Sequence, residues 1–230
     1  MAAVAMNPVV RIYRTSVGKK VIMAVTGTVG VLFLLGHIWG NLHVFEGSEA
    51  FNHYGEYLRV IGAPFFTSSQ LLWVIRFGLV ACLVLHVTCA VQLTRQSRAS
   101  RPVRYHAHKE PGASWSSLTM RVGGVIILFF IFIHLANLTF GTLHPSYIAG
   151  DVYHNVVALF QLWPVTLFYL VAMLAVGFHL DHGAWSLFQT LGFRTKGNHR
   201  LLRGGSLALA VVFVISSSTV PLAALFGFIG

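Results

Sequence analysis

Four histidines lie inside long apolar stretches of this sequence. LLGHIWG contains His37, VLHVTC contains His86, FIHLANL contains His134 and VGFHLDH contains His179. An imidazole in an apolar environment leaves polar nitrogens without water, so it needs a partner, and such residues mark functional sites in membrane proteins. A buried imidazole can bind a metal, relay a proton or hydrogen-bond a neighbouring helix. Which of these applies depends on how the surrounding segments place the four side chains.

The composition is that of a membrane protein. Hydrophobic residues make up 56% of the 230 residues, charged residues only 10%, and the mean hydropathy is +0.72. Five apolar stretches are long enough to cross a bilayer: about 21–44, 71–94, 118–140, 163–185 and 205–228. We predict an all-α integral membrane bundle of five transmembrane helices, built as one domain from residues 1–230. No cleavage site follows the N-terminal segment, so we expect no signal peptide.

Positive charge is confined to alternate connections between the spans. The 41–70 and 141–162 connections and the C-terminal tail contain only Arg59. The positive-inside rule therefore predicts a cytoplasmic N-terminus and an external C-terminus. This topology explains the net charge of +10 without nucleic acid, and leaves anionic lipid or an acidic subunit as partners of the basic face. That face holds Arg11, Arg14, Lys19, Lys20, Arg95, Arg98, Arg101, Arg104, Lys109, Arg194, Lys196, Arg200 and Arg203.

Two of the connections have a recognisable character. Residues 46–66 are amphipathic in their first half and end at Gly62 and Pro64, so we expect a short interfacial helix on the outer side. Residues 98–114 are basic and contain two prolines, so we expect an irregular cytoplasmic loop with solvated His106 and His108.

The predicted topology sorts the four histidines by depth. The first and third spans run outward and place His37 and His134 in their outer halves, whereas the second and fourth run inward and place His86 and His179 near the inner side. Two opposed imidazoles on different helices can hold a haem iron from both sides, which leaves no site for oxygen and restricts the iron to electron transfer. Small residues near the histidines leave room for a flat macrocycle: Gly30, Gly40, Cys82, Cys89 and Gly183.

Three alternatives remain open. Cys82 and Cys89, with two histidines, match the ligand types of a Rieske-type cluster. However, seven residues on one helix rise about 10.5 Å, too far for one iron unless the second span is broken near 84–87. The histidines could instead form a proton relay in a transporter, or the chain could be a structural anchor without a cofactor.

Several motifs, in this order, resemble the single-chain, five-helix cytochrome b membrane anchor of succinate dehydrogenase and fumarate reductase: GHIWGN, EAFNHYGEYLR, LLWVIR, LVLHVTCAVQLTR, FIHLANL and GFHLDHG. The resemblance covers residues 20–230 and implies two haem b groups, bound by His86 and His179 nearer the iron-sulfur subunit and by His37 and His134 on the distal side. The two cysteines are a departure from the family pattern.

The same resemblance implies partners and a location. A flavoprotein and an iron-sulfur subunit would dock on the cytoplasmic face of a bacterial plasma membrane, and whole complexes could form higher oligomers. The chain has no dinucleotide fingerprint, iron-sulfur cysteine run or catalytic carboxylate pair, so succinate chemistry would belong to the partners. The basic residues expected at the docking face are Arg11, Lys19, Lys20, Arg98, Arg101 and Arg104.

A quinone, expected to be menaquinone, would be the electron acceptor or donor, and its site needs an apolar slot, hydrogen-bond partners and a path to water. We favour the outer end, because two haems have little purpose if electrons leave on the side where they entered. The outer candidates are Trp39, Asn41, His43 and Glu46. The inner alternatives are Arg95, Asp181, His182 and Trp185.

Overall fold

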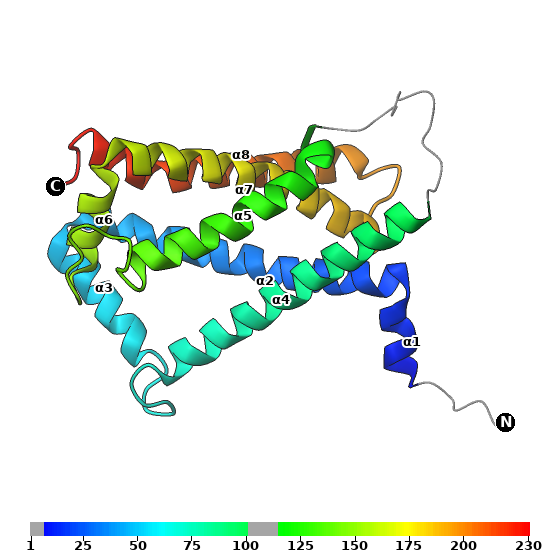
Figure 1. Ribbon diagram of the computed structural model, residues 1–230, viewed down its shortest axis with the longest axis horizontal. Helices are drawn as coiled ribbons and strands as arrows, with labels where there is room; N and C mark the ends of the chain where they lie inside the picture. Colours follow the sequence, from blue (N-terminus) through cyan, green and yellow to red (C-terminus); the bar gives the residue numbers. More distant parts are fainter. Residues whose placement is uncertain (1–6, 101–114) are drawn as a thin grey trace.

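The computed structural model describes residues 7–100 and 115–230, and all regular structure in these ranges is helical (Figure 1). Arg101, Arg104, His106, His108 and Lys109 lie outside the described residues, so the loop predicted for 98–114 is described only at its start. The helices in chain order are α1 (Pro8–Arg14), α2 (Ser16–Leu42), η1 (His43–Glu46), α3 (Ser48–Val60), α4 (Gln70–Ala99), α5 (Trp115–Leu138), α6 (Val152–Phe160), α7 (Trp163–Thr190) and α8 (His199–Leu225).

Five helices are long and apolar enough to cross a membrane, which confirms the predicted bundle: α2, α4, α5, α7 and α8. All five extend beyond the predicted apolar stretches at their basic ends. α2 begins at Ser16, where the Thr15 side chain accepts a hydrogen bond from the Gly18 amide, and α8 begins at His199. A 27-residue helix spans about 40 Å, longer than a hydrocarbon core of about 30 Å. The basic helix ends can therefore project into the polar region of the bilayer.

Short helices lie at both ends of the bundle. The short helix expected within 46–66 is α3, so its presence is confirmed, whereas its interfacial place on the outer side stays a prediction. Helices α1 and α6 were not predicted from the sequence. The start of α6 carried a signal, because Asp151 precedes an apolar run and its side chain accepts a hydrogen bond from the His154 amide.

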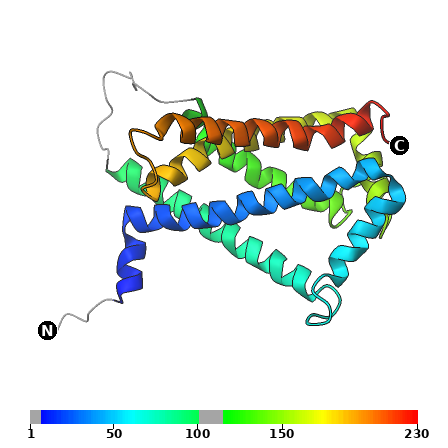
Figure 2. The ribbon, with the colours of Figure 1, turned by 180° about the vertical axis from the view of Figure 1, so that it is seen from behind.

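The two ends of the bundle differ in charge and covering (Figures 1 and 2). At one end α2 begins, α4 and α7 end, and α8 begins. We call this the basic end, because it carries the clustered Lys and Arg residues of α1, α2, α4 and the α7–α8 connection. Both views show α1 turning away from the start of α2 at this end. We call the opposite end, where α3 and α6 lie, the capped end.

The membrane helices do not all pack equally closely. Helix α7 packs on α8 and on α5, and α2 packs on α4 and on α7. In contrast, α4 does not pack closely on α5 or α7, and α2 does not pack closely on α5. Figure 1 shows α4 diverging from the other helices toward the capped end. Cys89 is the one buried residue recorded for α4, and large apolar side chains such as Val74 and Phe77 are exposed, as expected for a lipid-facing helix.

Candidate functional site

The four membrane histidines lie in two pairs. The rings of His37 on α2 and His134 on α5 have centroids 5.8 Å apart, and those of His86 on α4 and His179 on α7 have centroids 6.2 Å apart. In each pair the two helices are not closely packed on each other, so the rings face one another across the bundle interior. The structure thus brings together the same residues that the depth argument paired.

The spacing in both pairs fits a metal between the rings. Two imidazoles on opposite sides of one iron have ring centres roughly 6 Å apart, because each metal–nitrogen bond is about 2.0 Å and the ring centre lies roughly 1 Å further. The Nδ1 atoms of His134 and His179 are buried and have no hydrogen-bond partner among the described residues. Buried polar atoms are seldom left unpaired, so both rings fit a site that binds an additional group.

The orientation of His86 is set by a threonine of the neighbouring helix. The Thr26 hydroxyl donates to the Ile22 carbonyl oxygen at 2.8 Å and lies 3.1 Å from Nδ1 of His86. Because the hydroxyl has one proton, it accepts from His86, which places the ring proton on Nδ1 and leaves the Nε2 lone pair free for a metal. Such a hydrogen bond on the second nitrogen is typical of metal-binding histidines. Sequence analysis missed Thr26, although a hydroxyl within an apolar span was a signal.

Glycines adjoin the His86–His179 pair. A β-carbon at Gly27 would lie 3.5 Å from Cε1 of His86, and one at Gly124 would lie 3.7 Å from Cε1 of His179. Neither glycine was singled out from the sequence. Of the small residues that were, Gly30 and Gly183 border open space, whereas Gly40 packs under the Tyr54 ring, where a β-carbon would lie 2.6 Å from the hydroxyl oxygen.

The two cysteines lie on one continuous helix, α4. Both are free, Cys82 is half-buried and Cys89 buried, and α4 continues unbroken through both. Across residues 7–100 and 115–230, no three His, Cys, Asp or Glu side chains are grouped to hold a metal ion. The break in the second span that a Rieske-type cluster would require is therefore not present.

We expect Cys82→Ala and Cys89→Ala to leave any redox centres intact. The Cys82→Ala substitution should change the free energy of unfolding by less than about 0.5 kcal/mol. Cys89→Ala should change it by about 1 kcal/mol, because Cys89 is buried and both residues act as small packing residues. Optical and paramagnetic spectra of each purified variant measure this directly. Loss of a Rieske-type signal in either variant would contradict the packing role.

At the capped end, three of the outer quinone candidates lie close together. Nδ1 of His43 is 2.9 Å from Oε1 of Glu46, and the Trp39 and His43 rings are 6.2 Å apart. Trp39 is 69% exposed, so one of its faces is open to the apolar phase. Tyr54 of α3, which sequence analysis missed, lies with its ring centroid 4.7 Å from that of His43. Asn41 is half-buried nearby on α2.

The inner candidates are more dispersed. The Asp181 carboxylate is buried and accepts hydrogen bonds from both terminal guanidinium nitrogens of Arg203, one of them at 2.8 Å, so it is engaged in an ion pair. Trp185 packs edge-on against His199, and Arg95 is exposed on α4, which does not pack closely on α7. His182 is half-buried on α7.

A family model described as the succinate dehydrogenase/fumarate reductase transmembrane subunit matches residues 94–218. The chain belongs to this family. It is also 23% identical over 199 residues to the succinate dehydrogenase cytochrome b558 subunit of Bacillus subtilis (strain 168), an alignment that covers 86% of this chain and 89% of that protein. No solved structure matches the chain.

Family membership agrees with the architecture. A chain with five membrane-spanning helices that resembles a bacterial membrane subunit over most of its length is a multi-pass protein of a bacterial plasma membrane. It is a transmembrane subunit of a succinate dehydrogenase or fumarate reductase complex, the assignment also implied by the sequence motifs.

Proposed function

We propose that this chain is the membrane anchor and electron-transfer subunit of a succinate:quinone oxidoreductase, with two b haems held by His37 with His134 and by His86 with His179. The observation that carries the proposal is the presence of two histidine pairs, each with ring centres close to 6 Å apart, at two positions along one bundle. The name of the Bacillus relative, a cytochrome b558 subunit, supports haem b as the group. Bound haem would supply one-electron transfer between the iron-sulfur subunit and a membrane quinone.

The chain's own residues hold and orient these groups. Thr26 fixes the His86 ring with Nε2 free, and Gly27 and Gly124 keep side chains away from Cε1 of the two inner rings. Apolar neighbours such as Phe130, whose ring is 5.6 Å from that of His134, exclude water from the outer pair. A dry surrounding would limit the reorganisation of solvent during electron transfer and would keep water away from the bound group.

We place the basic end in the cytoplasm, with the flavoprotein and iron-sulfur subunits docked there. The asymmetric distribution of Lys and Arg supports this orientation. His86 lies beside Thr26 and Gly27 of α2, which are nearer the basic end than His37, so the haem of the His86–His179 pair would be nearer the iron-sulfur partner. The membrane quinone, expected to be menaquinone, would then react at the capped end beside the His37–His134 pair.

At the capped end, His43 and Glu46 form the proton path of this proposal. Six residues separate His37 from His43, a rise of about 9 Å along the helix. The His43 ring is half-buried and hydrogen-bonded to Glu46, whose side chain is 59% exposed. A quinone that packs against Trp39 could exchange protons with His43, and Glu46 would pass them to water.

A reduced-minus-oxidised optical spectrum of the purified complex tests the function. We expect sharp b-type bands corresponding to two haems, because each histidine pair has the spacing for one iron. A proton-relay transporter or a cofactor-free anchor would give no such bands, so their absence from a complex with intact flavin and iron-sulfur signals would contradict the proposal.

We expect His43→Ala and Glu46→Gln to slow quinone turnover about 10- to 100-fold, because positioned acid-base groups typically contribute at least this much. Succinate oxidation with a soluble dye acceptor should remain unchanged, because it does not use the membrane site. Glu49→Gln, which neutralises an exposed carboxylate on the adjacent helix α3, is the matched control. Normal quinone kinetics in both variants, or an inhibitor bound beside Arg95, would move the site to the basic end.

A further inference from the structure

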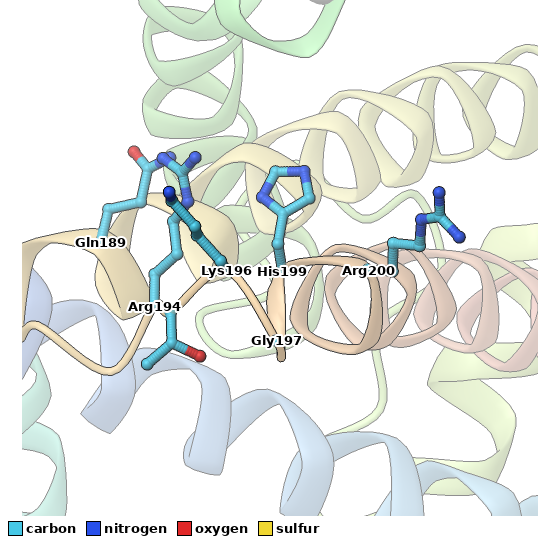
Figure 3. A pocket seen from close by; sticks show the side chains of 7 residues that line it. Gln189, Arg194, Lys196, Gly197, His199 and Arg200 are labelled. Atoms are coloured by element: carbon cyan, nitrogen blue, oxygen red, sulfur yellow. The ribbon is translucent and has the colours of Figure 1, made fainter.

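A basic cavity of about 930 Å³ lies at the connection between α7 and α8 (Figure 3). Figure 3 shows the side chains of Gln189, Arg194, Lys196 and His199 extending to the same side of this connection. Its lining carries three permanent positive charges and no acidic residue: Gln189, Arg194, Thr195, Lys196, Gly197, His199 and Arg200. The cavity therefore has the charge and the hydrogen-bond donors to bind a phosphate group.

Trp185 indicates the level in the membrane at which this basic cavity lies. Its ring packs edge-on against His199 at 4.9 Å between centroids, and the Arg194 guanidinium carbon lies 5.5 Å from its centroid. Tryptophan is enriched at the level of lipid headgroups, where its ring contacts both polar and apolar groups. The cavity consequently lies where lipid phosphates are expected.

An apolar groove of about 340 Å³ follows on the same pair of helices. Its lining residues are Leu174, Gly177, Phe178 and Asp181 of α7 and Arg203, Leu207, Ala210, Val211, Val214 and Ile215 of α8. Leu207, Val211 and Ile215 recur four residues apart and are 47–63% exposed. Arg200 and Arg203 precede them on the same helical face, so the basic cavity and the groove lie in line along α8.

The dimensions and charges match a phospholipid. From Arg203 to Ile215 the helix rises about 18 Å, close to the depth of one leaflet in a hydrocarbon core of about 30 Å. The ion pair between Asp181 and Arg203 lines the groove at its end nearer the basic cavity and adds no net charge there. Positive charge thus lies at the level of the headgroups and apolar surface lies below it. This distribution is complementary to an anionic lipid.

We propose that the basic cavity and the apolar groove of α7 and α8 together bind one anionic phospholipid, with its phosphate among Arg194, Lys196 and Arg200 and an acyl chain between the two helices. An acidic protein partner is the competing occupant of the basic cavity. Such a partner would leave the exposed apolar groove within the membrane unfilled, whereas a lipid fills both.

Native mass spectrometry of the delipidated, detergent-solubilised complex tests this binding. Phosphatidylglycerol, phosphatidylcholine with the same acyl chains, and inorganic phosphate are titrated separately. We expect phosphatidylglycerol to be retained in preference to phosphatidylcholine. Lys196→Gln with Arg200→Gln should weaken its binding about 25-fold, or about fivefold per neutralised residue. Val211→Trp, which fills the groove, should weaken lipid binding while leaving phosphate binding unchanged.

Arg14→Gln with Arg121→Gln is the matched control, because both residues are exposed at the basic end and line neither cavity. It should change lipid retention less than twofold. An equal loss of lipid in the control would show a diffuse charge effect and overturn the site. If inorganic phosphate bound as tightly as phosphatidylglycerol, and Val211→Trp had no effect, the cavity would be a site for free anions instead. Detachment of the iron-sulfur subunit without loss of lipid would assign the cavity to a protein partner. If the Gln variant does not assemble, Lys196→Arg with Arg200→Lys must retain lipid.

Discussion

We expect His86→Ala or His179→Ala to remove one of two b-type haem signals and to leave the other. The rings of His86 and His179 lie 6.2 Å apart, so loss of either imidazole would remove one of the two side chains proposed to hold that haem. His37→Ala and His134→Ala should remove the other signal, since those rings form the second pair at 5.8 Å. The measurement is the haem-to-protein ratio with low-temperature difference spectra, in which each variant should retain about half the haem.

Two comparisons make this result specific. His53→Ala removes an exposed histidine of α3 and should leave both signals unchanged. Thr26→Val removes the acceptor that orients His86 without removing a ligand, so we expect it to shift the inner signal and leave the outer one. Elimination of the same haem by His37→Ala and His86→Ala would show that the pairs are wrong.

The arrangement of these histidines was predictable because it depends on features that the sequence carries directly. Span length locates the five helices, and the alternation of Lys and Arg gives their directions, so the depth of His37, His86, His134 and His179 follows without any knowledge of side-chain contacts. The structure places the rings of both expected pairs within about 6 Å. The proximity follows from topology, whereas the ligand role rests on the chemistry proposed above.

Contacts between side chains of different helices were not predictable in this way. The rotation of each membrane helix about its axis is weakly encoded, because nearly every face is apolar and lipid replaces the solvent that would otherwise select one buried side. Thr26 facing His86, Gly124 facing His179 and Tyr54 facing His43 all depend on such rotations. For the same reason Asp181 was a quinone candidate in the sequence, although in the structure it pairs with Arg203.

The ion pair between α7 and α8 leads to the second large effect. We expect Arg203→Gln to lower the free energy of unfolding by about 3 kcal/mol, because it leaves the Asp181 carboxylate, whose side chain is only 8% exposed, without a compensating charge. Asp181→Asn should cost less, about 1–2 kcal/mol, because the Arg203 side chain is 36% exposed and can reach the polar boundary. Thermal unfolding of the purified complex measures both, and Arg203→Gln should lower the midpoint more than Asp181→Asn does.

The difference between the two substitutions distinguishes a buried charge pair from ordinary surface charge. Arg121→Gln, an exposed basic residue on α5, should change the free energy of unfolding by less than about 0.5 kcal/mol. Asp181→Asn combined with Arg203→Gln should be more stable than Arg203→Gln alone, because the neutral amide no longer requires a cation. Equal, small shifts in both single variants would show that water reaches the carboxylate, and that the packing of α7 on α8 depends on its apolar contacts alone.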